Sequence, residues 1–176
     1  MKPSEFLDRY AQECVDASVG TGIFPSVTIA QAIVESAWGK STPGNNMFGI
    51  QAHDQYSPYW NGEYIVANDN GRSTKFRKYK STSDSIKDHT YFLQRNGRYA
   101  AALKASTPEE QAKLLQDAGY AESKTYANTL ISIINSYNLK QYDEKKKGGI
   151  MNSKYVQIIM AVITIVFAAN IIYRNL

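Results

Sequence analysis

Residues 26–41 read SVTIAQAIVESAWGKS and combine an apolar helical pattern with a single carboxylate, Glu35. The apolar residues recur at helical spacing, which predicts an amphipathic helix from Pro25 or Ser26 to Trp38, ended by the glycine that follows. At roughly 100° per residue, Glu35 lies about half a turn from the apolar centre of this helix. A single Glu on a helix is most often solvated. This geometry therefore fits a carboxylate that faces a cleft and equally one that faces bulk water.

Other helices are predicted on both sides of this stretch. Ser81 lies three residues before Asp84, and Thr107 is followed by Pro108 and then by Glu110, so both places have the pattern of a capped helix start. The expected helices are Pro3–Val19, one that starts at Ser81, one from Thr107 to about Gly119, and one from about Ser123 to Tyr137.

A small β-lobe is predicted between the second and third helices. Glu63–Asn68 and Ser73–Tyr79 flank Asp69-Asn70-Gly71, and an Asn-Gly pair supplies the positive φ that a tight hairpin turn needs. A helical domain with such a lobe leaves a groove between the two parts. Glu35 falls at the end of a helix just before the lobe begins.

The charge distribution argues against a nucleic-acid partner. The whole chain has a net charge of +4, but residues 1–144 hold 15 Lys and Arg against 16 Asp and Glu, a net charge of 15 − 16 = −1. The positive excess lies in the C-terminal segment, so we expect no nucleic-acid binding. Cys14 is the single cysteine and cannot form an internal disulfide. Asp88-His89 lies within a predicted helix without a second ligand at suitable spacing, so we expect a structural role, no metal and no cofactor.

The C-terminal segment has the pattern of a membrane anchor. Residues 155–173, YVQIIMAVITIVFAANIIY, carry no charge and would span about 28 Å as a helix, close to the thickness of a bilayer core. We interpret them as a transmembrane helix with Tyr155 and Tyr173 at the two interfaces; the alternative is a buried core helix. Lysines at 145–147 and 154 precede the segment and only Arg174 follows it, which favours a cytoplasmic position for the preceding domain. No secretory signal is visible in the first residues.

Several short motifs occur in the order in which one known family has them. They are Glu35–Ser41, Asn46–Ile50, Phe76–Tyr79, Ser85–His89, Arg98-Tyr99, Gly119–Ala121 and Tyr126-Ala127. Together they resemble the glucosaminidase domain of glycoside hydrolase family 73, which includes bacterial autolysins, flagellar muramidase-type domains and phage lysins. The resemblance covers about Pro3–Leu139 and leaves the tail unexplained.

The resemblance implies an α+β, mainly α, lysozyme-like fold with a small β-hairpin lobe, and cleavage of the β-1,4 bond between N-acetylglucosamine and N-acetylmuramic acid in peptidoglycan. It also implies that Glu35 is the general acid. A glycosidic oxygen is a poor leaving group, so a protonated carboxyl must donate to it as the bond breaks. Desolvation beside Trp38 would raise the pKa of Glu35 and keep it protonated near neutral pH.

The second catalytic group is less defined by the sequence. The family often has a Glu in the β-lobe; here Asp69 is the nearest acid in the alignment and Glu63 the next, with Asp54 earlier. Asp69 also suits a hairpin turn for structural reasons alone. A third alternative needs no second acid, because the sugar acetamido group or closure of an anhydro ring could replace it.

Substrate-binding residues are expected along the groove. Tyr120 and Tyr126 match tyrosines of the family's groove, although the residues after Ala121 depart from the usual family sequence. Phe48, Trp38 and Asn46 are the other expected substrate-binding residues.

The predicted organisation is therefore a catalytic domain at 1–139, a basic linker at 140–153 and a transmembrane helix at 154–174. We expect a membrane-tethered peptidoglycan hydrolase for phage-type lysis or cell-wall penetration, held through its C-terminal anchor in the host inner membrane or the internal membrane of a virion. The alternatives are a lytic transglycosylase or muramidase on the same fold, and a non-catalytic glycan-binding or assembly protein.

Overall fold

The computed structural model describes residues 1–53, 55–69 and 71–148. The predicted transmembrane helix lies outside these ranges, and within them no helix is long and apolar enough to cross a membrane. The helices are α1 Pro3–Ser18, α2 Pro25–Ser36, α3 Thr82–Arg95, α4 Pro108–Asp117, α5 Tyr126–Ser136 and α6 Gln141–Gly148, the strands are β1 Tyr64–Asp69 and β2 Arg72–Arg77, and short 3-10 turns occur at Pro43–Asn45, Gly97–Tyr99 and Ala102–Lys104.

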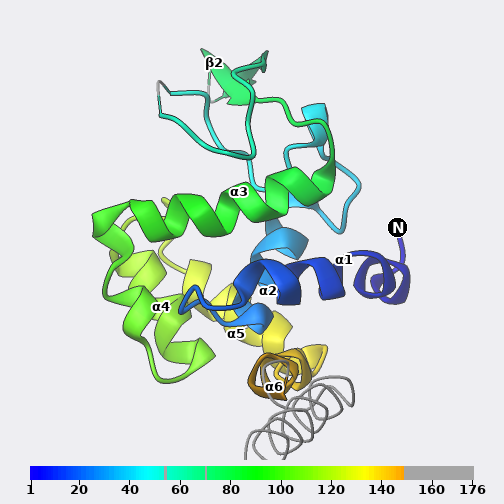
Figure 1. Cartoon of the computed structure of the whole chain (residues 1–176), viewed down its shortest axis with the longest axis vertical. Helices are drawn as coiled ribbons and strands as arrows, with labels where there is room; N and C mark the ends of the chain where they lie inside the picture. Colours follow the sequence, from blue (N-terminus) through cyan, green and yellow to red (C-terminus); the bar gives the residue numbers. More distant parts are fainter. Residues whose placement is uncertain (54, 70, 149–176) are drawn as a thin grey trace, which may run out of the picture.

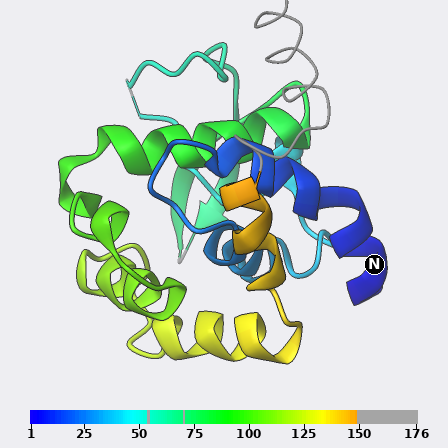
Figure 2. The ribbon, with the colours of Figure 1, turned by 60° about the horizontal axis from the view of Figure 1, so that its bottom comes forward.

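The helices form one body and the hairpin forms a lobe at its edge. Figure 1 shows the lobe at one end of the long axis, α3 across the middle and α6 at the opposite end. In Figure 2, α6 lies beside α1 and α2, and it contacts both of them. The expected mainly helical architecture with a small two-stranded sheet is confirmed.

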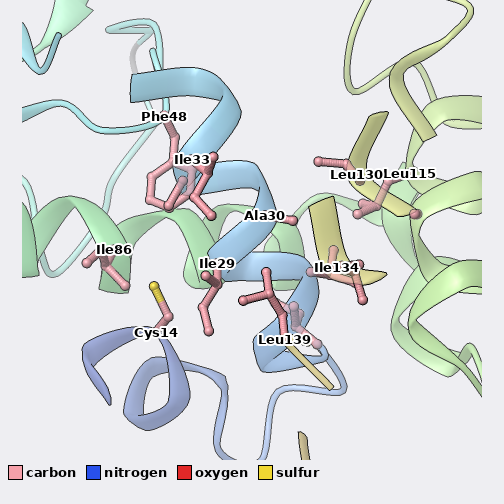
Figure 3. Close-up of a cluster of buried hydrophobic side chains, with 14 of the residues drawn as sticks. Cys14, Ile29, Ala30, Ile33, Phe48, Ile86, Leu115, Leu130, Ile134 and Leu139 are labelled. Atoms are coloured by element: carbon pink, nitrogen blue, oxygen red, sulfur yellow. The ribbon is translucent and has the colours of Figure 1, made fainter. Parts of the chain in front are cut away.

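Helix α2 lies at the centre of the core. All of its residues except Val34 and Glu35 are buried, and α1, α4, α5 and α6 all contact it. Figure 3 shows Ile29, Ala30 and Ile33 of α2 among side chains from the surrounding elements. Because this helix is enclosed by its neighbours, the position of Glu35 at its end is fixed by packing on nearly every side.

Helix α2 ends two residues earlier than the sequence pattern predicted. Ala37 and Trp38 have φ values of 49° and 61°, in the left-handed region, and the Trp38 amide donates to the Ile33 carbonyl at 3.0 Å. The chain therefore turns sharply after Ser36. Glu35 lies in the last turn of the helix, and Trp38 lies outside it.

The hairpin and the helix starts follow their local sequence signals. Strands β1 and β2 pair antiparallel from Tyr64 opposite Arg77 to Asp69 opposite Arg72, and Gly71 in the turn has a φ of 82°. The predicted caps are confirmed. The Ser81 hydroxyl accepts from the Asp84 amide at the start of α3, and Thr107 does the same for Glu110 at the start of α4, both at 3.1 Å.

Part of the segment that was expected to be a linker is helical and contacts the core. In α6, the Asp143 carboxylate accepts from the Ser26 amide at 2.8 Å and from the Ser26 hydroxyl at 2.7 Å. Lys140 forms an ion pair with Glu109 of α4. The first amides of a helix have no partner within the helix and favour a negative charge nearby. Asp143 therefore stabilises the start of the helix that has Glu35 near its end.

Candidate active site

A cleft of about 640 Å³ opens between the β-lobe and the helical body, with Glu35 in its wall. The lining comes from four places: the end of α2, the loop from Phe48 to Gln55, strand β2, and the region from the end of α3 to Ala121. The lining residues are Glu35, Phe48, Gly49, Ile50, Gln51, His53, Gln55, Phe76, Arg77, Phe92, Asn96, Arg98, Tyr99, Tyr120 and Ala121.

Glu35 is open to the cleft yet partly desolvated. The residue is accessible to solvent, as a proton donor to an incoming sugar must be. The protein atoms around its carboxyl still exclude enough water to raise the pKa of Glu35 above the usual value. A hydrogen bond from Tyr126 opposes this effect without cancelling it. The direction of the pKa shift is the one that a general acid requires.

Two residues hold the Glu35 carboxyl in place. The Tyr126 hydroxyl donates to Glu35 Oε1 at 3.0 Å, and Gln31 Nε2 donates to the same tyrosine hydroxyl at 3.1 Å. Burial raises the pKa of Tyr126 and that of Tyr120, which stacks on it with ring centroids 5.5 Å apart. Both phenols therefore remain protonated, and the direction of the donation from Tyr126 is fixed.

An aromatic wall continues from Glu35 toward the lobe. Phe48 stacks on the imidazole of His89 at a centroid distance of 3.9 Å and an interplanar angle of 10°, and Tyr120 meets the same ring edge-on at 5.9 Å. His89 is fully buried, and within the described residues neither of its ring nitrogens has a hydrogen-bond partner. Burial lowers the pKa of His89 to about 3, so the ring is neutral at ordinary pH. His89 therefore supports the aromatic wall of the cleft by packing against Phe48 and Tyr120.

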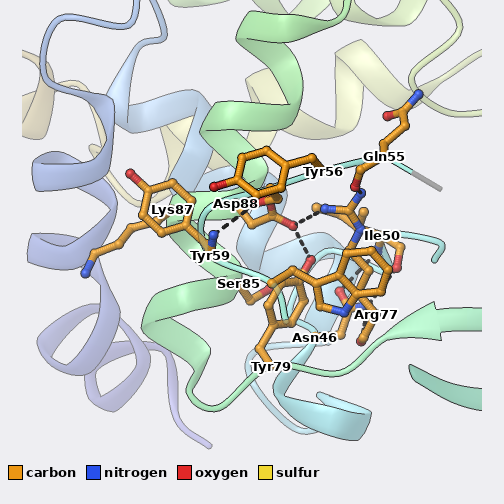
Figure 4. A network of polar contacts seen from close by, with 12 residues as sticks. Asn46, Ile50, Gln55, Tyr56, Tyr59, Arg77, Tyr79, Ser85, Lys87 and Asp88 are labelled. Carbon is orange, nitrogen blue, oxygen red and sulfur yellow. Dashed lines mark hydrogen bonds and ion pairs between the residues drawn. The ribbon is translucent and has the colours of Figure 1, made fainter. Parts of the chain in front are cut away.

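A buried polar network fixes the lobe to α3. Asp88 of α3 is fully buried and accepts hydrogen bonds from Arg77 Nη1 at 2.8 Å, from the Tyr79 hydroxyl at 2.6 Å and from the Ser57 hydroxyl. Arg77 Nη2 also donates to the Gln55 carbonyl at 3.1 Å. Figure 4 shows Arg77 of β2 and Tyr79 of the segment that follows it close to Asp88 of α3. Arg77 and Gln55 line the cleft, so Asp88 fixes one of its walls.

This geometry can be compared with known proteins. A family model described as glucosaminidase, mannosyl-glycoprotein endo-beta-N-acetylglucosaminidase, matches residues 11–139, well over half of the chain.

The chain belongs to the glucosaminidase family.

Similar proteins carry related names. The chain is 33% identical over 138 residues to the exo-glucosaminidase LytG of Bacillus subtilis, which covers 69% of this chain and 47% of that protein. It is 35% identical over 156 residues to the peptidoglycan hydrolase FlgJ of Salmonella typhimurium, covering 80% of this chain and 48% of that protein. The crystal structure of the catalytic domain of the autolysin Auto from Listeria monocytogenes has a TM-score of 0.69 at 30% identity, covering 81% of this chain and 90% of that domain.

These comparisons confirm the expected membership in a family of glycoside hydrolases with a lysozyme-like fold. This glucosaminidase chain spans less than half the length of the curated relatives that it matches. The match to the family model ends at Leu139, so α6 lies beyond it.

The structure places most of the expected substrate-binding residues in or beside the cleft. Phe48 and Tyr120 line it, and Tyr126 lies just behind Glu35. Asn46 is buried behind the lining, where its amide donates to the Ile50 carbonyl at 2.9 Å and to the Arg77 carbonyl at 3.0 Å, and so joins the loop to the lobe.

Trp38 is not among the residues that line the cleft of this glucosaminidase domain. It packs between Phe6 and Tyr137, with ring centroids 5.6 and 4.8 Å away. The sharp turn after Ser36 directs its side chain toward these two rings. The raised pKa of Glu35 results from burial by the surrounding protein atoms.

Of the two acids proposed from the sequence as partners of Glu35, Glu63 is not among the described residues that line the cleft. Glu63 is exposed, binds Lys78 Nζ at 3.0 Å and accepts from Asn61 Nδ2 at 3.0 Å, and the Lys78 contact lowers its pKa. Asp69 is the last residue of β1, at the tip of the hairpin, and its side chain lies outside the described part of the structure. Among the described lining residues, Glu35 is the one with a carboxyl group.

Sequence reasoning missed the cleft roles of Arg77, Asp88 and Arg98. The motifs that contain them were recognised as family signals, and Asp88 was expected to be structural. No local pattern showed that Arg77 and Asp88 would meet across 11 residues, or that Arg98 would reach the cleft. Asp88 falls on the apolar face of a predicted helix. A charged residue at such a position indicates a buried partner, and this is the one sequence signal that could have found the pair.

Proposed function

We propose that this domain is a peptidoglycan hydrolase that cleaves the β-1,4 bond between N-acetylglucosamine and N-acetylmuramic acid, with Glu35 as its general acid. The observation that carries the proposal is a solvent-accessible carboxyl in the wall of a cleft, with a raised pKa and a fixed hydrogen bond from Tyr126. The similarity to an exo-glucosaminidase and to a peptidoglycan hydrolase supports the choice of substrate.

The chemistry follows from the position of Glu35. A glycan strand in the cleft would place a glycosidic oxygen against the protonated carboxyl, which donates its proton as the C–O bond breaks. The hydrogen bond from Tyr126 orients the carboxyl and stabilises the carboxylate that remains. Phe48 and Tyr120 line the cleft as aromatic side chains, which would pack against the apolar parts of the sugars.

A mechanism with one protein acid would fit the described lining of the cleft, which does not include the side chains of Asp54 and Asp69. Among the described lining residues, only Glu35 has a carboxyl group. Glu63 is exposed and forms an ion pair with Lys78. The oxocarbenium-like centre would then be stabilised by the acetamido group of the substrate itself. Asp69 and Asp54 remain candidates for an acid that activates water.

The test is digestion of purified sacculi by the wild-type protein and by Glu35→Gln, followed by mass spectrometry of the products. We expect lysis by the wild type, loss of lysis in the variant by at least about a hundredfold, and products with N-acetylglucosamine at the reducing end. Reducing or anhydro N-acetylmuramic acid would contradict the assigned bond. Absence of lysis by the wild type would instead favour a glycan-binding protein.

The same assay identifies a second acid. Asp54→Asn, Glu63→Gln and Asp69→Asn each remove one carboxylate of the lobe region. A one-acid mechanism predicts that all three retain activity within about threefold of the wild type, whereas loss comparable to that of Glu35→Gln in any one of them would assign the partner.

We also propose that residues 155–173 tether the domain to a membrane, either the inner membrane of a host cell or the internal membrane of a phage virion. The absence of charge over 19 residues and the flanking tyrosines support this proposal. The test is extraction of membranes at alkaline pH, in which the full chain should stay with the lipid and a chain that ends at 148 should not. Protease treatment of intact spheroplasts would then show on which side the domain lies.

A further inference from the structure

Arg98 is a cation in the wall of the cleft, and no acid of the described residues forms an ion pair with it. Among the described residues that line the cleft, the charged ones are Glu35, Arg77 and Arg98. Arg77 is paired with the buried carboxylate of Asp88 at 2.8 Å, so its charge is compensated inside the protein. Arg98 is exposed, and within the described residues no carboxylate lies within ion-pair distance of it. Its charge is therefore available to a ligand in the cleft.

The Arg98 guanidinium has a preferred position. The residue lies in the short turn Gly97–Tyr99 that follows α3, and its guanidinium carbon is 4.8 Å from the centroid of the Tyr99 ring. Tyr99 is itself buried and lines the cleft. Because the ring is fixed, a guanidinium that stacks on it loses less freedom when it binds a ligand than one on an unsupported side chain does.

The positive charge of Arg98 is a local feature of the cleft, because the domain as a whole is not basic. Residues 1–144 have a net charge of 15 − 16 = −1. The one described acid of the lining, Glu35, has a raised pKa and so is neutral over a wider pH range than an ordinary Glu. An exposed cation without an ion-pair partner in such a cleft attracts an anionic ligand.

We propose that Arg98 binds a carboxylate of the glycan strand and selects strands that carry muramic acid over strands of neutral sugars. This inference rests on the proposed function. A planar guanidinium forms paired hydrogen bonds with a carboxylate. Two carboxylates of peptidoglycan could fill the role: those of the stem peptide, and the lactyl carboxylate of a muramic acid without its peptide. A chitin-like strand offers neither.

The experiment compares three forms of the same polymer. Native sacculi carry stem-peptide carboxylates, sacculi stripped of peptide by an amidase carry lactyl carboxylates, and sacculi coupled to methylamine with a carbodiimide have their carboxylates neutralised. Initial rates of reducing-end release are measured for the full-length wild type, Arg98→Gln, Arg98→Lys and Arg95→Gln. The Arg95 variant removes the same charge from the end of α3, where the residue does not line the cleft. Thermal unfolding checks that each variant is folded.

The expected result is a wild type about three- to tenfold faster on a carboxylate-bearing form than on the neutralised form. Arg98→Gln should slow cleavage of the carboxylate-bearing form more than that of the neutralised form and so remove the preference. Arg98→Lys should keep part of the preference, and Arg95→Gln should keep all of it. The carboxylate-bearing form that gives the preference identifies which carboxylate is bound.

Three results would overturn the inference. They are equal wild-type rates on all forms, a preference that survives in Arg98→Gln, and an Arg98→Gln loss that is as large on the neutralised form as on the others. In these cases cleavage by the wild type leaves the proposed function intact. No cleavage of any form by the wild type would refute the proposed function itself, and the inference with it.

Discussion

Substitution of Asp88 tests how strongly the buried network holds the lobe. The side chain of Asp88 is 0% exposed and that of its partner Arg77 is 4% exposed. Asp88→Asn keeps the shape of the side chain but leaves the Arg77 guanidinium buried without a counter-charge. Removal of one partner of a buried ion pair costs about 3–5 kcal/mol, out of a typical total stability of about 5–15 kcal/mol.

The free energy of unfolding would be measured with urea, and the melting temperature by circular dichroism. For a domain of this size, a loss of about 3–5 kcal/mol lowers the melting temperature by about 10 °C or more. Asp8→Asn in α1 is the matched control, because Asp8 is exposed, and its effect should stay within about 0.5 kcal/mol. The rate on sacculi, measured where Asp88→Asn is still folded, should also fall because Arg77 and Gln55 line the cleft.

A double variant separates the ion pair from packing. Arg77→Met with Asp88→Asn removes both charges and keeps an acceptor for the Tyr79 hydroxyl, so it should be less destabilised than Asp88→Asn alone. A loss below about 1 kcal/mol in Asp88→Asn, or a double variant whose loss equals the sum of its single variants, would refute the reasoning.

Three further predictions concern pH and the end of the domain. Tyr126→Phe removes the hydrogen bond that lowers the pKa of Glu35, so the alkaline limb of the pH–rate profile should move to higher pH; a shift to lower pH would contradict the assigned role. His89 has a pKa of about 3 when folded against about 6.5 when unfolded, so its contribution to stability is present above pH 6.5 and is lost as the pH falls toward 3. Urea unfolding at pH 7 and pH 5 should show a loss of about 2 kcal/mol from this group that is absent in His89→Phe; equal losses in both proteins would contradict it. Asp143→Ala should lower stability by about 1–2 kcal/mol through the start of α2, and an unchanged melting temperature would show that the contact with Ser26 contributes nothing.

The sequence was enough to predict those structural features that depend on residues within one short segment. The caps at Ser81 and Thr107 are formed by a side chain and an amide three residues apart, and Gly71 beside the hairpin strands has the positive φ that the local sequence predicted. Glu35 was identified by the ordered motifs around it, although its own helix left it as a solvated residue. These features depend on contacts over a few residues, which a pattern in the sequence contains.

The tertiary structure decided the features that depend on distant contacts. The turn after Ser36 placed Trp38 on Phe6 and Tyr137, and burial in the folded domain raises the pKa of Glu35. Asp143 reaches the start of α2 across 117 residues. Local periodicity shows which face of a helix is apolar, whereas the pKa of a carboxyl depends on the atoms around it, and those are brought together only when the chain folds.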